Sequence, residues 1–303
     1  MTDQLEVTPA TKAPETGGFG VRERTQTEIV VRRFLRHKLA VGSLVLLILI
    51  VIIAYGGAAL WKYDLHSTPD ISQPPSWEHP FGTDGPGHDW LARVLRGLQQ
   101  SIKIALSVAL IGTVLGTIWG SIAGYFGRHV DNALMRLADL VIILPGIAVA
   151  ATLASLGEGT WWMIAVIIGG LASANVSRLI RGVVLSLREQ DFIEAAKALG
   201  ASDTRIILRH LVPNALGPTI VSATILVAVG ILAETGLSFL GFGVQSPDTS
   251  LGLLVQEAAG AVNTRPWLFY FPGLFIILIA LTINFIGDGL RDAFDPKQTR
   301  VRQ

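Results

Sequence analysis

The feature that most constrains this chain is a run of 22 residues, Leu39 to Leu60, without a charged side chain. A helix rises 1.5 Å per residue, so this run is long enough to cross a hydrocarbon core of about 30 Å. Thirteen of its residues are Leu, Ile or Val. Each favours insertion by about 0.3–0.6 kcal/mol, so together they favour it by roughly 4–8 kcal/mol. The run therefore predicts a membrane-spanning helix.

The residues before this run do not have the form of a cleaved signal peptide. The run is preceded by 38 residues, and it is longer than the usual apolar region of a signal peptide, about 7–15 residues. We therefore expect a permanent anchor. Residues 1–35 are rich in Thr, Glu, Pro and Gly. Because such a segment buries too little apolar surface to form a core, we expect a disordered cytoplasmic tail.

Further apolar segments predict a polytopic membrane protein. Half of the residues are hydrophobic and only 16% are charged, which is too apolar for a soluble domain of this length. The chain is expected to be all-α, with residues 36–303 forming one transmembrane domain. The six expected spans cover about residues 39–60, 101–126, 134–156, 161–180, 215–239 and 267–290.

The distribution of basic residues predicts the orientation. An even number of spans puts both termini on one side, and that side would hold nineteen of the 24 Lys and Arg residues. The positive-inside rule therefore predicts cytoplasmic termini in the plasma membrane. Aromatic residues at the opposite interface agree with this, with Trp61, Tyr63, Trp161, Trp162 and Trp267 at span ends. The loop 61–100 on that side is expected to be an irregular cap followed by a helix from about His88.

The loop 187–213, between the fourth and fifth spans, predicts two short helices joined by a kink. Asp191 has the position of an N-cap with Glu194 three residues later, which is the spacing of a capping box. Gly200 offers a left-handed stop, Ser202 a cap for the next helix and Pro213 its boundary.

The first of these helices has an apolar stripe with two small residues at its centre. Phe192, Ala195, Ala196 and Leu199 follow the i, i+3, i+4, i+7 spacing. Such a helix suits docking in the groove of a soluble partner. Composition alone slightly favours the other interpretation, a helix lying on lipid headgroups, because the basic residues of the loop would suit anionic lipid.

A family resemblance distinguishes these two interpretations. Glu194-Ala195-Ala196, Gly200 and His210-Leu211-Val212-Pro213 closely resemble the EAA loop of ABC importer permeases. In that family a coupling helix docks in the nucleotide-binding subunit. The family commonly has Ile and Leu where this chain has His210 and Val212, a difference in the packing behind the helix.

Other segments resemble the dipeptide and oligopeptide branch of that family. They are the basic entry to the first span at residues 32–40, the motif at 81–89, the third-span pattern around Pro145, the end of the fifth span at 234–241 and the signature at 284–296. The resemblance implies a type I importer permease that forms half of a translocation pathway for peptides. It also implies partners: a second homologous permease subunit, ABC ATPase subunits and an extracytoplasmic substrate-binding protein.

The same resemblance assigns roles to residues of the loop. The residues expected to couple to the ATPase are Asp191, Phe192, Glu194, Ala195, Ala196, Leu199, Gly200, Ala201 and Ser202. The sequence contains no Gly-Lys dipeptide and therefore no P-loop. We expect a transport subunit without enzymatic activity or cofactor of its own, with ATP and Mg on the partner ATPase. Membrane lipid is an expected contact, and nucleic acid is not an expected partner.

Polar residues in the spans suggest further candidates. Arg136 with Asp139, and Asp288 with Arg291, have the i,i+3 spacing of helical ion pairs. Asn175, Glu234 and Ser238 are candidates for the substrate pathway because polar groups in a membrane are often functional. Four glycines at intervals of four in the second span, from Gly112 to Gly124, predict close helix packing. The chain has no cysteine and its histidines have no metal-like spacing, so no metal site is expected.

Two alternatives remain at this stage. The same permease architecture carries nickel or glutathione in related systems. A self-sufficient secondary transporter or channel belongs to a different class, but such proteins usually have paired interrupted helices or titratable groups near the midplane. The sequence shows neither clearly.

Overall fold

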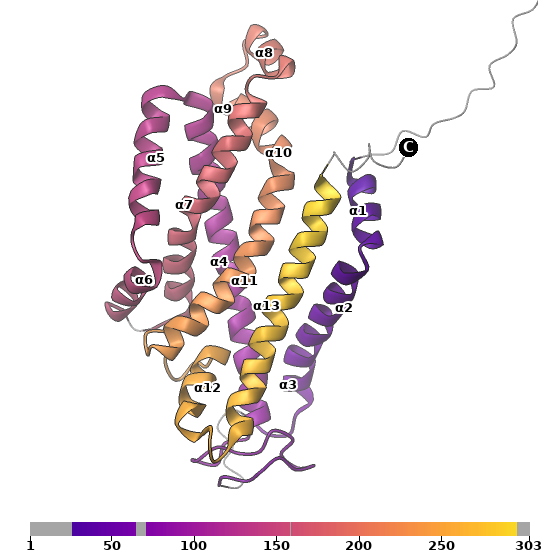
Figure 1. Cartoon of the computed structure of the whole chain (residues 1–303), viewed down its shortest axis with the longest axis vertical. Helices are drawn as coiled ribbons and strands as arrows, with labels where there is room; N and C mark the ends of the chain where they lie inside the picture. Colours follow the sequence, from indigo (N-terminus) through magenta and orange to yellow (C-terminus); the bar gives the residue numbers. More distant parts are fainter. Residues whose placement is uncertain (1–25, 65–70, 158, 296–303) are drawn as a thin grey trace, which may run out of the picture.

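A computed structural model describes residues 26–64, 71–157 and 159–295. The described residues form helices without strands, packed in one elongated bundle (Figure 1). The all-α expectation is therefore confirmed. In chain order the helices are α1 (Gln26–Arg36), α2 (Lys38–Ile52), the π-helix η1 (Ile53–Gly57), α3 (Ala58–Leu60), α4 (Trp90–Phe126), α5 (Arg128–Ile143), α6 (Gly146–Ser155), α7 (Trp161–Leu187), α8 (Asp191–Ala198), α9 (Asp203–Ile206), the π-helix η2 (Ile207–Leu211), α10 (Val212–Asn214), α11 (Leu216–Phe239), α12 (Leu251–Ala258), the short helix η3 (Ala259–Ala261) and α13 (Pro266–Phe294).

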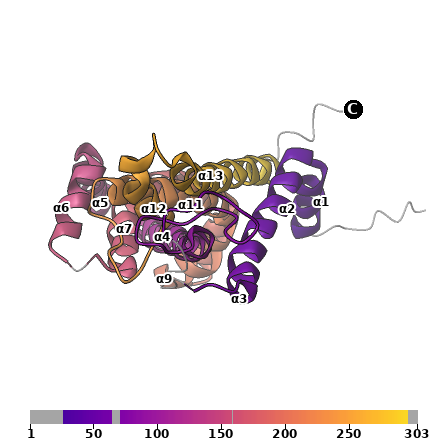
Figure 2. The ribbon, with the colours of Figure 1, turned by 90° about the horizontal axis from the view of Figure 1, so that it is seen from below.

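Five helical segments among the described residues are long and apolar enough to cross a membrane. They are Lys38–Leu60, α4, α7, α11 and α13. Helix α4 lies at the centre of the bundle, with α5 and α6 on one side and α1, α2 and α13 on the other (Figure 2). Helix α4 starts at Trp90, so the helix expected after the cap and the second span form one continuous helix of 37 residues.

The third expected span, residues 134–156, is not a straight helix. It consists of α5 and α6, which are bent by 85° relative to each other. The bend lies at Leu144 and Pro145, both in extended conformations. Proline has no N–H to donate and drives the preceding residue out of the helical region, so an apolar run that looks continuous is broken here.

The glycine ladder of α4 packs against α7, as expected. A Cβ atom on Gly116 would lie 2.5 Å from the Cβ atom of Val176, and one on Gly120 would lie 2.4 Å from the carbonyl oxygen of Ser177. Side chains at these positions would overlap with α7. The glycines therefore let the two backbones approach closely.

The tail expected over residues 1–35 is helical from Gln26 onward; residues 1–25 lie outside the described part. Helix α1 is held against α13 because Arg33 donates to the carbonyl oxygen of Asp295 at 2.9 Å. Gly289 of α13 lies beside Phe34 and Ala40, where an added Cβ would meet the Cβ of Ala40 at 2.3 Å. This packing orders a segment that composition alone predicts to be disordered.

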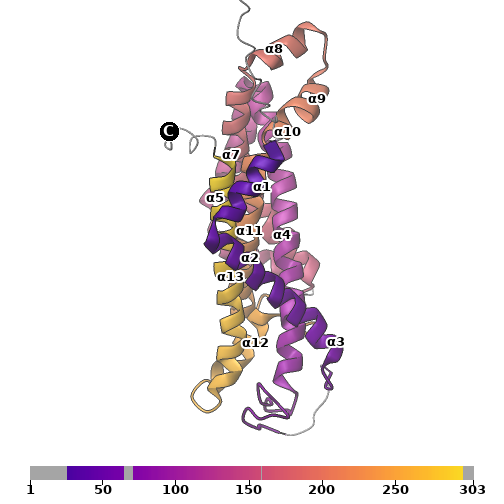
Figure 3. The same cartoon turned by 90° about the vertical axis from the view of Figure 1, so that its right-hand side faces the viewer.

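The two ends of the bundle differ. Helices α8 and α9 protrude at one end, where α1 begins and α13 ends, and the irregular segment before α4 lies at the other (Figure 3). We call residues 187–213 the coupling loop and residues 71–89 the cap. We call the two ends of the bundle the coupling-loop end and the cap end.

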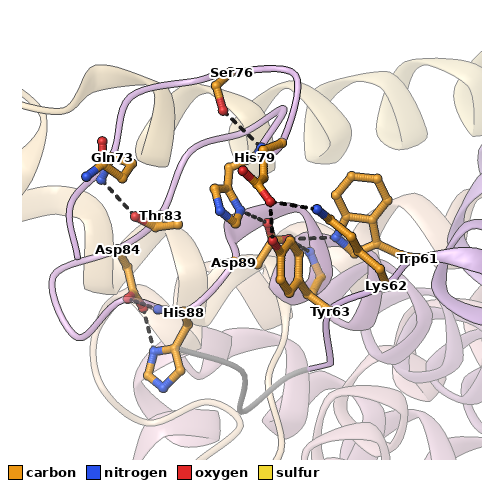
Figure 4. A network of polar contacts seen from close by, with 12 residues as sticks. Trp61, Lys62, Tyr63, Gln73, Ser76, His79, Thr83, Asp84, His88 and Asp89 are labelled. Atoms are coloured by element: carbon orange, nitrogen blue, oxygen red, sulfur yellow. Dashed lines mark hydrogen bonds and ion pairs between the residues drawn. The ribbon is translucent and has the colours of Figure 1, made fainter. Parts of the chain in front are cut away.

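The cap is organised around two buried carboxylates (Figure 4). Asp84 accepts the backbone N–H groups of Gly87 at 2.8 Å and His88 at 2.7 Å, and it lies 2.8 Å from the His88 ring. Arg93 of α4 donates to the same carboxylate at 3.0 Å. These contacts tie the turn before α4 to the helix itself.

Asp89 is the second carboxylate and the N-cap of α4. It accepts the N–H of Ala92 at 2.8 Å and the indole N–H of Trp61 at 2.9 Å. Its other oxygen lies 2.8 Å from Nδ1 of His79, which is buried. One side chain thus joins the end of the first span, the cap and the start of α4.

Candidate functional site

The coupling loop forms two short helices, as the sequence predicts, but the first begins differently. Gln190 is the N-cap of α8 and makes no side-chain capping bond, so the expected capping box of Asp191 and Glu194 is wrong. Both acidic residues instead lie in the first turn. There they face the positive end of the helix dipole, which is a favourable place for a carboxylate.

The end of α8 and the start of α9 confirm the sequence prediction. Gly200 has φ of +78°, and the N–H of Ala201 donates to the carbonyl oxygen of Ala196 at 3.1 Å. This is the bond pattern of a helix that ends at a left-handed glycine. Ser202 then caps α9 by accepting the N–H of Arg205. The sharp turn between the helices is therefore specified by local residues.

The apolar stripe of α8 faces away from the bundle. Phe192 is 42% exposed and Leu199 is 88% exposed, and Ala195 is also exposed while Ala196 is partly buried. The inward contact of α8 comes from Ile193, which is fully buried and packs in a cluster with Ile206 and Leu211. Ile193 lies outside the stripe predicted from the sequence. An apolar residue about 100° around the helix from Phe192, outside the stripe, is the sequence signal that could have identified this contact.

Two side-chain contacts join the coupling loop to the central helix. The hydroxyl of Tyr125, near the end of α4, donates to Asp203 of α9 at 2.6 Å. Arg188, just after α7, donates to the carbonyl oxygen of Gly124 at 3.0 Å. These two hydrogen bonds connect the coupling loop to α4, the longest helix of the described residues.

The ion pairs of α5 differ from the expectation. Asp139 pairs with Arg178 of α7 rather than with Arg136 of its own helix. Asp131, which the sequence analysis did not single out as an ion-pair partner, forms a two-pronged pair with Arg181 of α7. Helices α5 and α7 pack side by side, so arginines that are distant in sequence lie next to these carboxylates.

The pair expected between Asp288 and Arg291 is also wrong. Among the described residues, the contact at this end of α13 joins His37 Nε2 and Asp292 Oδ2 at 3.7 Å. Asp288 is exposed. The partner of Asp292 is His37, which caps α2 and so belongs to another element.

A cavity of about 470 Å³ lies between the bent pair α5 and α6, α7 and α11. Its walls are apolar, and Asn175 is the one side chain with a polar group among its lining residues. The neighbouring Ser173 and Ser177 donate to carbonyl oxygens of their own helix. Of these three polar residues of α7, only Asn175 lines the cavity.

Glu234 and Ser238 lie in a buried polar cluster and do not line this cavity. Both are almost fully buried, at 0% and 1% exposure. Ser238 donates to Glu234 at 2.6 Å, and Ser101 of α4 lies 3.5 Å from its other oxygen. Ser101 also accepts the N–H of Leu251, so the cluster joins α11, α4 and α12. Packing turns both side chains inward in this conformation, and their role in a substrate pathway stays a prediction.

No group of three or more His, Asp or Glu side chains suited to a metal ion occurs in the part of the chain that the structure describes. Two features are candidates for function: the exposed helix α8 at one end and the apolar cavity beside the broken helix α5 and α6.

Comparison with known families supports the resemblance seen in the sequence. Residues 116–300 match the family described as binding-protein-dependent transport system inner membrane component. Residues 25–75 match the N-terminal transmembrane domain of oligopeptide transport permease C.

Curated relatives are similar over most of the chain. The chain is 42% identical over 279 residues to the oligopeptide transport system permease protein OppC of Mycobacterium tuberculosis, covering 91% of this chain and 96% of the relative. It is 41% identical over 270 residues to the protein of the same name in Escherichia coli, covering 88% and 89%.

A solved structure shows the same fold. A chain of the methionine ABC transporter MetNI, in an inward-facing conformation, aligns with a TM-score of 0.54 at 18% identity. The alignment covers 67% of this chain and 97% of that one. The expectation of an ABC importer permease fold is therefore confirmed.

Proposed function

The chain belongs to the family of inner-membrane components of binding-protein-dependent transport systems, and from this premise we propose that it is one permease subunit of an ATP-driven peptide importer. It is a multi-pass membrane protein of the inner membrane. Peptide is the proposed cargo because the curated relatives described above are oligopeptide permeases. ATP hydrolysis, with Mg, belongs to a partner subunit, and a binding protein delivers the cargo.

The observation that carries this proposal is the exposed stripe of α8. An apolar surface that contains Phe192 and Leu199 has no partner within the described part of the chain, and it projects beyond the ends of the membrane helices (Figure 3). Such a surface fits the helix-in-groove mode of recognition. In this proposal an ATPase subunit holds α8, and its ATP-driven movement is passed to α4 through Tyr125 and Asp203.

The orientation follows from the same assignment. If α8 meets a cytoplasmic ATPase, then the start of α1 and the end of α13, which lie at the same end, are cytoplasmic as well. The cap then faces the binding protein. This agrees with the excess of basic residues expected on the cytoplasmic side.

The pathway is proposed to run past the cavity that Asn175 lines, between this chain and a second permease subunit. Rigid-body movement of the two subunits would open it alternately to each side. An apolar wall with a single amide offers little side-chain selectivity, which suits a cargo of varied peptides.

The experiment that tests this proposal is purification of the tagged chain in mild detergent, followed by mass spectrometry of the co-eluting proteins. We expect a second polytopic subunit and an ATPase with a P-loop. The matched variant Phe192→Glu with Leu199→Glu should retain the second permease subunit and lose the ATPase. A chain that purifies alone and transports peptide without ATP would contradict the proposal.

A further inference from the structure

A second cavity, of about 430 Å³, lies at the cap end, away from the cavity that Asn175 lines. Its wall comes from four parts of the chain: the turn of the cap, the start of α4, the end of α12 and the start of α13. Its charged and titratable lining residues are Asp84, His88, Arg93, Glu257 and Arg265. A volume of this size is typical of small-ligand sites.

Arg93 pairs with both carboxylates of this cavity, which leaves one formal negative charge that Arg265 balances. Arg93 donates to Asp84 at 3.0 Å and to Glu257 at 2.7 Å, and its side chain is only 15% exposed. Asp84 also accepts two backbone N–H groups and contacts the ring of His88. The two carboxylates of the cavity are therefore both engaged by Arg93.

Arg265 is the other arginine that lines this cavity. It lies beside Gly85, at the residue before α13, and donates through Nη1 to the hydroxyl of Ser72 at 2.8 Å. Within residues 26–64, 71–157 and 159–295, no ion pair to Arg265 is formed. A guanidinium has five N–H donors. One cavity cation thus keeps most of its donors for a ligand.

Contacts within the chain hold the walls around Arg265 in place. The indole N–H of Trp90 donates to the carbonyl oxygen of Leu268 at 3.0 Å, which locks the start of α4 to the start of α13. The guanidinium of Arg93 stacks over the Trp90 ring at 5.2 Å. A preformed site loses less conformational entropy on binding than a flexible one.

We propose that this cavity is a carboxylate-binding site and that Arg265 is its receiving group. The planar guanidinium matches a carboxylate through two parallel hydrogen bonds, and Arg265 keeps for this the N–H donors that it does not use with Ser72. The site rests on the cavity alone. Only the source of the carboxylate rests on the proposed function: it is either the C-terminus of a peptide or an acidic side chain of the docked binding protein.

The first test uses the purified complex in nanodiscs and the reaction of phenylglyoxal with arginine, followed by peptide mass spectrometry. The probe is N-acetyl-diglycine, which ends in a free carboxylate, and the control ligand is its C-terminal amide. We expect the acid, and not the amide, to slow modification of Arg265 by about threefold or more at saturation. Arg96, which lies at the same end and is 48% exposed, is the matched arginine at which acid and amide should act alike.

The second test separates the two sources by peptide uptake in cells that carry Arg265→Gln or Arg265→Lys. Loss of the preference for free-acid over amidated peptides assigns the carboxylate to the cargo. An equal fall for both peptides in Arg265→Gln, with partial recovery in Arg265→Lys, assigns it to the docked protein.

Equal protection of Arg265 by acid and amide, together with wild-type uptake in Arg265→Gln, overturns the proposal. The protection measurement does not depend on transport. If co-purification refutes the importer assignment while the acid still protects Arg265, the carboxylate site stands and the proposed function does not.

Discussion

The cap and the coupling loop are both connections between membrane helices, but they are built in opposite ways. In the cap, Thr83 and Asp89 are fully buried, and the carboxylates of Asp84 and Asp89 each serve several donors. In the coupling loop, the exposed residues include large apolar ones, and Leu199 is 88% exposed. The cap pairs its buried carboxylates within the chain, although Nε2 of the buried His79 has no hydrogen-bond partner among the described residues. The loop instead keeps apolar side chains exposed.

This difference shows where each end obtains its stability. The cap is stabilised by buried polar contacts within the chain, which are costly to break because unsatisfied donors would remain. The coupling loop is stabilised by short-range helix signals and by a few inward residues such as Ile193. We infer that changes in the cap lower stability directly, while changes in the loop mainly affect association with a partner.

The change expected to have the largest effect on stability is Asp89→Ala. It removes the N-cap of α4 and leaves the partly buried indole N–H of Trp61 and the buried ring of His79 without their acceptor. We expect a loss of roughly 3–5 kcal/mol in unfolding free energy, comparable to breaking a buried ion pair. Thermal unfolding of the detergent-solubilised protein measures it.

Asp89→Asn is the matched control for this change. Its amide oxygen still accepts one hydrogen bond at the cap, so we expect an intermediate loss. If Asp89→Ala unfolds at the wild-type temperature, the cap is not the stabilised end of the molecule.

The second change, Gly200→Val, affects the turn between α8 and α9. No atom lies within 4 Å of the position of an added Cβ, so the penalty is the left-handed backbone at φ of +78°. For a β-branched side chain this is roughly 1–2 kcal/mol, enough to reorient α8 without preventing membrane insertion. We expect normal amounts in the membrane, with ATP hydrolysis uncoupled from peptide uptake in proteoliposomes.

Gly200→Asn serves as the control for backbone strain, because asparagine tolerates the left-handed conformation. It should retain coupling. Normal uptake in Gly200→Val would show that the orientation of α8 is not important for transport.

The features predicted from sequence are those encoded by neighbouring residues. The stop at Gly200, the cap at Ser202 and the glycine ladder were all found, because each depends on one residue type within a helix or at its end. The break at Pro145 was missed as a structural feature. The apolar run continues on both sides of it, and hydropathy does not report backbone direction.

The features that were missed depend on packing between distant segments. Asp139 and Arg178 are 39 residues apart, and no spacing rule within one helix pairs them. Glu234 contacts Ser101 of α4 as well as Ser238 of its own helix, so this candidate pathway residue lies in a buried cluster. The cavity at Arg265 likewise needs four segments to be assembled.

A smaller effect on stability is expected from Leu199→Ser. The side chain is almost fully exposed, so its removal should change the unfolding free energy by less than about 0.5 kcal/mol. Affinity for the ATPase should fall, because an apolar anchor is lost from the docking stripe. Co-purification yield and thermal unfolding, measured on the same preparation, test both expectations.

Leu208→Ser is the matched control, since Leu208 is 64% exposed and lies outside α8. It should leave the co-purification yield unchanged. Equal loss of the ATPase in both variants would assign docking to the whole coupling loop rather than to the stripe of α8.

The smallest effect is expected from Glu78→Gln, in the exposed half of the cap. Lys62 and Tyr63 each donate to Glu78 at 3.0 Å, and these bonds, with Lys62 the larger cause, lower the pKa of Glu78. Because the pKa is lower in the folded state, the contacts of Glu78 stabilise the folded state at pH values above the ordinary carboxyl pKa. This stabilisation is lost as the pH falls through the lowered pKa. Because the pair is exposed, water and salt screen it, so the difference in unfolding temperature between wild type and variant should be small at neutral pH and absent in acid. A difference in unfolding temperature that grows in acid would contradict this assignment. If the difference at neutral pH were as large as the one for Asp89→Ala, the exposed half of the cap, rather than its buried carboxylates, would stabilise this end.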